Sequence, residues 1–297
     1  MAMNIPPNTW MVAMKRLSRN KLAMLCALLL LLTVIACYGA GLSPYGYAEQ
    51  NLALGATAPS LQHWLGTDVL GRDNLTRILY GGQLSLAVAF ASTSVALFIG
   101  ITWGGIAGYA GGRTDIIMMR IVDSLYALPF MILIILLMVV FGRNVLLMFL
   151  AIGAVEWLTM ARIVRAQVMM IKQQDYVLAA ELLGLPTSTI LTRHILPNII
   201  GPVIIYTTLT IPQVILLESF LSFLGLGVQP PQSSWGVLVA NGVETMEQYP
   251  WLLIAPAGVL SLVLFAFNFL GDGLRDALDP KSTSNTTHDP ITTGPAV

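Results

Sequence analysis

Six long apolar segments, separated by polar loops, dominate the pattern along this chain. They cover residues 22–42, 84–110, 125–141, 145–161, 199–218 and 251–270. Each is close to the roughly 20 residues that a helix needs to cross the hydrocarbon core of a bilayer. The chain is 56% hydrophobic and 10% charged, with a mean hydropathy of +0.76, which excludes an ordinary soluble domain. The pattern predicts an all-α polytopic membrane protein with six transmembrane helices.

Polar segments flank the apolar region at both ends. Residues 1–21 form a short polar lead with four basic residues, and residues 281–297 are polar and rich in Pro and Thr. The run 22–42 exceeds the apolar core of a secretory signal, so we expect an uncleaved first helix. The tail has the composition of a disordered segment. A transmembrane domain is therefore expected over residues 22–280.

The basic residues are distributed unequally between the two sides of the predicted bundle. Of the 15 Lys and Arg residues, only Arg72, Arg77 and Arg143 fall on one side when the loops are assigned alternately. Cytoplasmic loops of membrane proteins carry an excess of Lys and Arg. The distribution predicts cytoplasmic N- and C-termini and a cytoplasmic loop 162–198. The formal net charge of +0 gives no indication of a nucleic-acid partner.

Within this loop, residues 175–197 have the pattern of a short helical hairpin. An apolar face with two small residues follows the spacing i, i+3, i+4 and i+7, formed by Tyr176, Ala179, Ala180 and Leu183. Gly184 and Pro186 are expected to break the first helix, and Pro197 to end the second. The hairpin is therefore predicted to present a face suited to close docking.

The spacing in this hairpin resembles the cytoplasmic EAA signature of binding-protein-dependent ABC importer permeases. The matching positions are Ala179, Ala180, Gly184, Ile190, His194, Leu196 and Pro197. Leu178 stands where the signature has Glu, although Glu181 lies one turn away. The resemblance implies a type I ABC importer permease architecture with a coupling helix that docks on a separate ATPase subunit. It implies that the coupling residues are Tyr176, Ala179, Ala180, Gly184, His194 and Pro197; the alternative is an ordinary amphipathic loop.

A second resemblance lies in the loop that follows the first apolar segment. Residues 65–73 read LGTDVLGRD and are similar to the LGTDxxGRD stretch of peptide and nickel importer permeases. Gly66 and Gly71 allow tight turns there. Four charged residues can pair and hold the loop folded, namely Asp68, Arg72, Asp73 and Arg77. A structural role and a partner-docking role for this outer loop both remain open.

The fifth apolar segment ends abruptly in turn-forming residues that include Pro230 and Pro231. The candidates for an outer gate or pathway here are Glu218, Gly225, Gly227 and Trp235. Two roles for Glu218 remain open. It could stabilise the fold by pairing with backbone amides or a loop cation such as Arg72, Arg77 or Arg143. It could instead attract the amino terminus of a peptide at the entrance.

The resemblance continues through residues 267–280 and is closest to the second permease type of oligopeptide importers. It implies a non-catalytic subunit of the bacterial inner membrane that imports oligopeptides. The implied partners are a second homologous permease, two ATP-binding cassette subunits and a periplasmic peptide-binding protein, besides the lipid bilayer. Dipeptides, murein peptides, nickel complexes and opines are alternative cargoes.

Motifs for nucleotide binding, metal binding or catalysis do not occur in the sequence. None of the four lysines follows a glycine, so a Walker A loop is excluded, and ATP and magnesium are expected on partner subunits. The three histidines lie in loops, which disfavours an intramembrane enzyme. A secondary transporter usually has internally repeated halves, which six helices with a coupling hairpin do not suggest. Cys26 and Cys37 are about 16 Å apart along a helix, too far for a disulfide.

Overall fold

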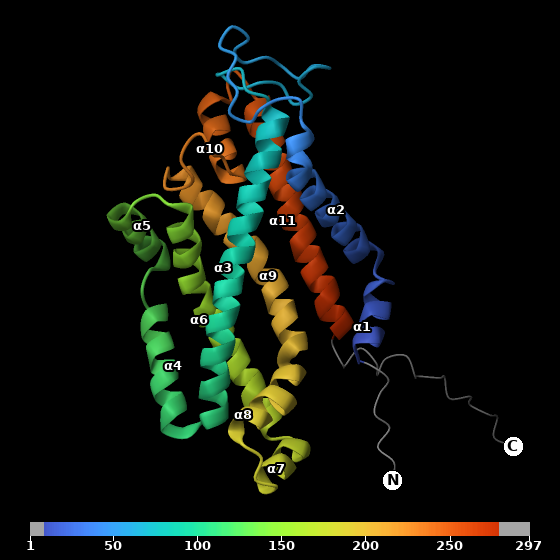
Figure 1. The fold of residues 1–297 in the computed structure, drawn as a ribbon, viewed down its shortest axis with the longest axis vertical. Helices are drawn as coiled ribbons and strands as arrows, with labels where there is room; N and C mark the ends of the chain where they lie inside the picture. The colour runs from blue at the N-terminus through green and yellow to red at the C-terminus, as the bar shows by residue number, and fades with distance from the viewer. Residues whose placement is uncertain (1–8, 279–297) are drawn as a thin grey trace, which may run out of the picture.

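Helices form the regular structure of residues 9–278, which are the residues that the computed structural model describes. Figure 1 shows an elongated bundle whose long helices run roughly side by side. The five that are long and apolar enough to span a membrane are α2 (Lys21–Tyr38), α3 (Asn74–Ala110), α6 (Val145–Lys172), α9 (Leu196–Phe223) and α11 (Trp251–Leu278). The all-α polytopic architecture is confirmed. The predicted tail 281–297 lies outside the described residues.

Shorter helical segments connect the long ones. They are α1 (Thr9–Leu17), the 3₁₀ turn η1 (Gly39–Leu42), α4 (Gly112–Tyr126), α5 (Phe130–Phe141), α7 (Asp175–Leu182), α8 (Thr187–Thr189), the π-helical η2 (Ile190–Ile195) and α10 (Trp235–Thr245). Within the polar lead, α1 packs against α11. The side chain of Asn20 then accepts a hydrogen bond from the backbone N–H of Ala23 and caps the start of α2.

The third predicted span, 125–141, is not one straight helix. Residues 127–129 separate α4 from α5, and the two helices meet at an angle of 76°. Pro129 explains the break, because proline lacks a backbone N–H and disfavours a helical conformation in the residue before it. The 12 residues of α5 reach only about 18 Å, too short to cross a bilayer alone. Six spans are therefore obtained only if α4 and α5 together count as one bent span.

Close contacts between α3 and α6 form the centre of the bundle. Gly100, Gly104 and Gly108 recur every four residues along the face of α3 that meets α6. A Cβ atom at Gly104 would lie 2.3 Å from the carbonyl oxygen of Ala161, so only glycine permits this approach. A Cβ atom at Gly153 of α6 would lie 2.9 Å from Cβ of Val95 in α3. Inside lipid the hydrophobic effect does not drive helices together. Small residues let the two backbones approach closely, and van der Waals packing then stabilises the contact.

Pro197 does not end the second hairpin helix, contrary to the sequence prediction. The chain continues from η2 directly into α9, with Pro197 in the first turn of α9. A proline ring crowds the carbonyl four residues earlier, and the wider π-helical turn before it makes continuation possible. Residues Thr187–Phe223 therefore form one helical run of 37 residues, about 55 Å long.

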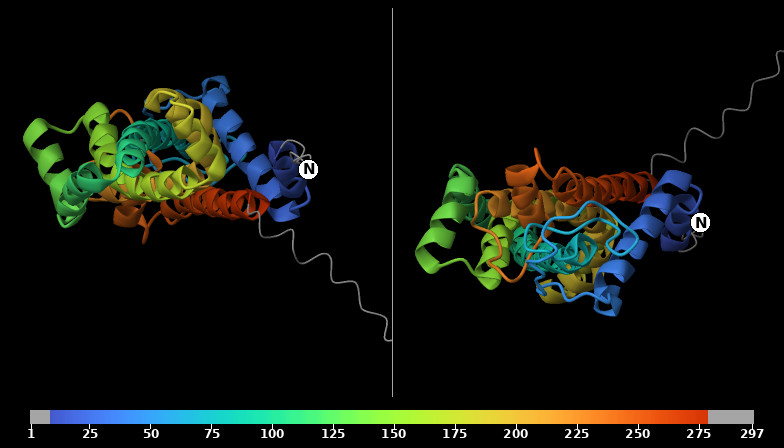
Figure 2. Two further views of the ribbon diagram at one scale, coloured as in Figure 1. Left: turned by 90° about the horizontal axis from the view of Figure 1, so that it is seen from below. Right: turned by 90° about the horizontal axis from the view of Figure 1, so that it is seen from above.

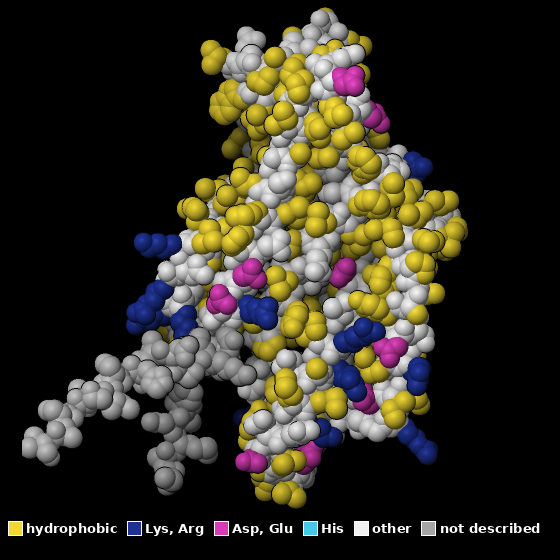
Figure 3. All heavy atoms as spheres, turned by 180° about the vertical axis from the view of Figure 1, so that it is seen from behind, with side chains coloured by type: hydrophobic (Ala, Val, Ile, Leu, Met, Phe, Trp, Pro, Cys, Tyr) yellow, Lys and Arg dark blue, Asp and Glu magenta, His cyan; other side chains and the backbone are white. Residues whose placement is uncertain are grey.

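The two ends of the bundle differ in structure. Residues 43–73 lie as a loop across one end, as the view from above in Figure 2 shows, and α7 lies at the opposite end. In Figure 3, hydrophobic side chains cover most of the upper part of the visible face, and most of the visible Lys and Arg lie in the half that carries α7. We refer below to the α7 end and the loop end of the bundle.

Candidate functional site

The hairpin at the α7 end has a defined corner at Gly184. The N–H of Leu185 bonds the carbonyl of Ala180 at 3.2 Å, and the N–H of Gly184 bonds the carbonyl of Glu181 at 3.0 Å. This pair of bonds is a Schellman motif, which requires a left-handed residue after the helix. Gly184 has a φ of +74°, where a side chain is strained. The sequence prediction of a helix break at this glycine is confirmed.

Two faces of α7 have different environments. Val177 and Ala180 are buried in a cluster with Ile190, Ile195 and residues of α6 and α9. Leu182 and Leu183 are 90% and 81% exposed, and Tyr176 is 45% exposed. The predicted single stripe is therefore divided, because Ala180 turns inward while Tyr176, Ala179 and Leu183 stay accessible. We call these accessible residues, together with Leu182, the outer face of α7.

Polar contacts attach the hairpin to the long helices. The hydroxyl of Tyr109 in α3 donates to Oε1 of Glu181 at 3.1 Å. The Nζ atom of Lys172, at the end of α6, donates to the backbone carbonyl of Tyr109 at 2.7 Å. This bond of Glu181 has no signal in the local sequence, because its partner lies 72 residues away in the chain. These contacts fix the position of α7 below α3 and α6.

The remaining predicted coupling residues lie beside α7 on the second arm of the hairpin. The ring of His194 lies 6.4 Å from the ring of Tyr176, measured between centroids. Burial raises the pKa of the Tyr176 hydroxyl, so this group is neutral at physiological pH. His194 is half-buried, whereas Pro197 is exposed. The structure thus places five of the six predicted coupling residues in the two arms and corner of the hairpin, with His194 beside Tyr176, and Pro197 at the start of α9.

At the loop end, the charged residues of the LGTDVLGRD loop form ion pairs that include Arg77 of α3 and His63. Asp68 accepts hydrogen bonds from Nε of Arg72 at 2.7 Å and from the guanidinium of Arg77. Asp73 caps α3 by accepting from the N–H of Thr76 at 2.8 Å, and it contacts Nδ1 of His63 at 2.9 Å. The predicted pairing is confirmed for Asp68 with Arg72 and Arg77, whereas Asp73 pairs with His63 and caps α3 instead.

The two loop glycines occupy the tight turns that the sequence predicts. Gly66 and Gly71 both have a φ of +72°. A Cβ atom at Gly71 would lie 2.0 Å from the backbone oxygen of Asn51, so the two chain segments can touch only if this residue is glycine. The charged residues and the turns therefore make the loop a folded cover rather than a loose connection.

Glu218 lies near the loop end of α9 and is fully buried. Its carboxyl accepts hydrogen bonds from the hydroxyls of Ser222 at 2.7 Å and Ser85 at 3.2 Å. Within residues 9–278 it forms no ion pair, and Arg72 and Arg77 are held by Asp68. The cation partner considered from the sequence is therefore not observed; serine hydroxyls of α3 and α9 take its place.

Trp235 connects this polar cluster to the segment that follows α9. It is fully buried, its Nε1 donates to the carbonyl of Ile78 at 3.0 Å, and its N–H donates to Oγ of Ser85 at 3.1 Å. Gly225 has a φ of +74° and ends α9 in a second Schellman motif. A Cβ atom at Gly227 would lie 2.1 Å from Oγ of Ser222. Together, these residues fix the turn between α9 and α10, which we call the outer turn.

The described residues contain no group of three or more His, Cys, Asp or Glu side chains that could hold a metal ion. Cys26 and Cys37 are free thiols, as their spacing predicts, and both are buried within the protein. The two arrangements that stand out are the exposed outer face of α7 and the closed polar cluster at Glu218.

Comparison with known proteins identifies related transport components. Residues 100–284 match the family described as binding-protein-dependent transport system inner membrane component. Residues 8–59 match the N-terminal TM domain of oligopeptide transport permease C. The chain is 47% identical over 275 residues to the oligopeptide transport system permease protein OppC of Haemophilus influenzae, covering 92% of this chain and 88% of the relative.

Two further relatives show the same degree of similarity. The oligopeptide transport system permease protein OppC of Escherichia coli is 48% identical over 277 residues, which is 92% of this chain and 91% of the relative. The dipeptide transport system permease protein DppC of Bacillus subtilis is also 48% identical, over 271 residues that cover 91% of this chain and 85% of the relative. Sequence identity therefore does not separate relatives named for oligopeptides from one named for dipeptides.

Proposed function

We propose that this chain, which belongs to the family of inner-membrane components of binding-protein-dependent transport systems, forms half of a pathway for imported oligopeptides. As a member of this family it is a multi-pass inner-membrane permease subunit of an ABC transporter. It is a non-catalytic component that works with an ATPase, a binding protein and a partner permease. In the proposed complex the partner is a second homologous permease. The complex contains two ATPase subunits, and one of them binds at the α7 end of this chain.

The observation that carries the proposal is the outer face of α7. Leu182 and Leu183 are almost fully exposed although they are large apolar residues in a polar hairpin beyond the long apolar runs. Val177 and Ala180, on the opposite face, anchor the helix to its own chain. An anchored helix with exposed apolar residues is suited to docking in a groove of another protein. We therefore assign the outer face of α7 to the ATPase subunit.

The connection between α7 and the rest of the molecule suggests how ATPase closure moves the permease. The second arm of the hairpin is continuous with α9, so a displacement of α7 acts on one end of the Thr187–Phe223 run. The other end of this run carries Glu218 and the outer turn. Rigid-body movement of such a run would couple the two ends. Its energy comes from the different affinities of the ATPase for the two permease conformations.

The orientation of the chain follows from the proposed docking. The ATPase acts in the cytoplasm, so the α7 end must face inward and the loop end must face the binding protein. The distribution of Lys and Arg supports this orientation. The loop held by Asp68 and Asp73 would then offer the binding protein a rigid surface. Both termini would lie in the cytoplasm.

The proposed cargo is an oligopeptide because residues 8–59 match a domain named for oligopeptide transport permease C. Dipeptides are the second candidate, since the relative named DppC is as similar to this chain as the OppC relative of Escherichia coli. Mass spectrometry of the peptides that copurify on the cognate binding protein distinguishes the two candidates by length.

Single cysteines on a Cys26→Ala, Cys37→Ala background test the docking and the orientation together. We expect Leu183→Cys to cross-link to an ATPase subunit through a short thiol-to-amine reagent, whereas Ser60→Cys in the outer loop should not. In intact cells, with an outer membrane permeabilised where one is present, a membrane-impermeant thiol reagent should label Ser60→Cys but not Ser188→Cys. All three positions are exposed in the isolated chain, so accessibility within the chain is matched.

Two outcomes would contradict the proposal. External labelling of Ser188→Cys would reverse the orientation. A complex that imports peptide but gives no cross-link from Leu183→Cys would remove the outer face of α7 from the ATPase interface.

A further inference from the structure

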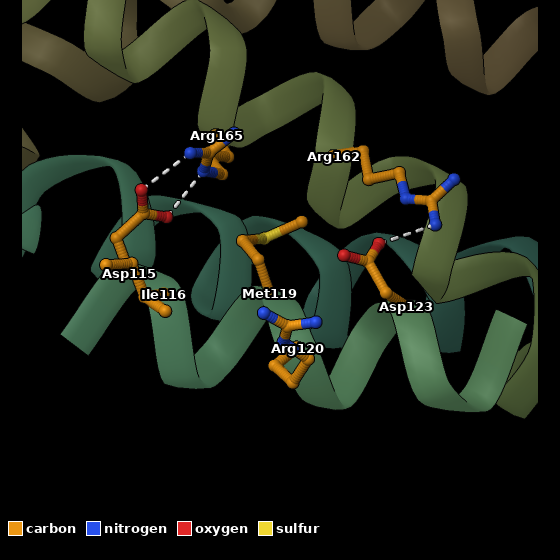
Figure 4. Close-up of a pocket in the computed structure, with 7 residues that line it drawn as sticks. All are labelled: Asp115, Ile116, Met119, Arg120, Asp123, Arg162 and Arg165. Atoms are coloured by element: carbon orange, nitrogen blue, oxygen red, sulfur yellow. Dashed lines mark hydrogen bonds and ion pairs between the residues drawn. The ribbon is translucent and has the colours of Figure 1, made fainter. Parts of the chain in front are cut away.

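A charged pocket lies between α4 and α6, away from the hairpin and the outer turn. Its volume is about 490 Å³, and its lining is formed by Asp115, Ile116, Met119, Arg120, Asp123, Arg162 and Arg165. Figure 4 shows that the acidic residues belong to α4 and that two of the three arginines come from α6. We call it the Arg120 pocket. None of these residues takes part in the proposed coupling mechanism.

Two ion pairs lie at the sides of the pocket, and they include two of its three arginines. Arg165 binds Asp115 through Nη2 at 2.6 Å and also through Nε. Arg162 binds Asp123 at 2.8 Å and stacks on the ring of Tyr126. Arg120 forms no ion pair with any residue in the range 9–278, and in Figure 4 its guanidinium lies between the two pairs. The pocket is thus complementary to a single negative charge.

An apolar groove continues from the same arginine along α4. A second cavity of about 390 Å³ shares Arg120 and Ile116 with the pocket and is otherwise lined by Ile117, Ile121, Ser124 and Leu125. Ile117 and Ile121 are 62% and 43% exposed. A positive charge at the head of an exposed apolar groove matches an amphipathic anion. A small inorganic anion would leave the groove empty.

The pocket lies at the depth where the apolar part of the bundle ends. Apart from Glu156, the α6 segment from 145 to 161 contains no charged residue, and Arg162 and Arg165 follow it immediately. The change from apolar to basic residues marks the boundary at which lipid headgroups lie. Basic pockets between transmembrane helices at this boundary are suited to anionic headgroups.

We propose that the Arg120 pocket binds the phosphate headgroup of an anionic phospholipid, with an acyl chain in the groove formed by Ile117, Ile121 and Leu125. The geometry places this lipid beside the bend between α4 and α5, the one broken span of the described bundle. The lipid would cover the exposed side of α4 without contacting α7. The proposal does not depend on which cargo the complex carries.

Titration of a phosphatidylglycerol with a fluorescent acyl chain into the purified complex tests this site. We expect Arg120→Gln to weaken binding about fivefold, the effect of one cation near a lipid headgroup. Arg113→Gln is the matched control, because it removes the same charge from the same helix outside the pocket and should leave the affinity unchanged. Arg120→Lys keeps the charge and should retain most of the binding.

Three results would overturn the proposal. Equal losses in Arg120→Gln and Arg113→Gln would show that the lipid senses only the overall surface charge. Competition by inorganic phosphate at the same concentration as the lipid would show a free-anion site that does not use the apolar groove. Loss of the second permease from Arg120→Gln complexes, on size-exclusion chromatography in detergent, would assign this face to the subunit interface.

Discussion

The hairpin at the α7 end and the polar cluster at Glu218 differ in the side chains that they expose and bury. At the α7 end, large apolar residues such as Leu182 are exposed. At the loop end, polar groups such as Glu218 and Ser85 are buried and bonded to one another. The α7 end therefore exposes apolar side chains that a partner could cover, whereas the carboxyl of Glu218 is bonded within its own chain. The comparison supports the proposal that a partner covers the α7 end, whereas the Glu218 cluster is part of the fold of this chain.

The largest expected effect concerns Trp235, which fixes the outer turn. Trp235→Ala removes a fully buried side chain and its bond to the carbonyl of Ile78. We expect the free energy of unfolding to fall by about 3–5 kcal/mol, as for other buried aromatic residues. Thermal denaturation of the purified chain in detergent would measure the change.

Leu182→Ala provides the control from the opposite end. Since Leu182 is 90% exposed, its truncation should change the stability of the isolated chain by no more than about 0.5 kcal/mol. Similar destabilisation by Trp235→Ala and Leu182→Ala would remove the distinction between the two ends.

The general architecture could be predicted from the sequence because it depends on the lengths of apolar runs. The start of α3 could not. Its apolar run begins near residue 84, yet the helix begins at Asn74, because the charge of Arg77 is paired with Asp68 and Gly82 packs closely against Trp235. The pair of Asp68 and Arg77 was a candidate in the loop sequence, but Trp235 lies far along the chain from Gly82 and leaves no local signal near the start of α3.

The candidate sites were predictable to different degrees. The corner at Gly184 was predictable because a glycine directly after a helix readily adopts the left-handed conformation that ends the helix. The partners of Glu218 were not, because Ser85 lies 133 residues earlier in the chain. The continuation through Pro197 was also missed, since the π-helical turn that permits it has no simple sequence pattern.

An intermediate effect is expected at the hairpin corner. Gly184→Arg places a side chain at a φ of +74°, which costs about 1–2 kcal/mol locally. It also adds a charge beside the outer face of α7. We expect the variant to fold but to lose most peptide-stimulated ATPase activity in the assembled complex, because the docking helix is displaced.

Gly184→Asn separates the backbone effect from the docking effect. Asparagine tolerates the left-handed conformation and adds neither charge nor great length. It should therefore retain substantially more stimulated activity than Gly184→Arg. Full peptide uptake by the Gly184→Arg complex would contradict a coupling role for this corner.

The smallest expected effect concerns Glu218, where a structural role and a gate role make different predictions. Glu218→Gln keeps the size of the side chain but replaces one acceptor oxygen by an NH₂ group, so the hydroxyls of Ser222 and Ser85 must reorient. Because the carboxyl is fully buried and bonded to these serines, we expect a loss of about 1 kcal/mol in stability and unchanged peptide uptake. The exposed Glu244 in α10 provides the matched control, and Glu244→Gln should change neither quantity. Thermal denaturation and uptake by reconstituted complexes would be measured on both variants. A fall in uptake for Glu218→Gln at unchanged stability and assembly would instead assign this carboxyl to the entrance of the pathway, and the loop end would then take a direct part in transport.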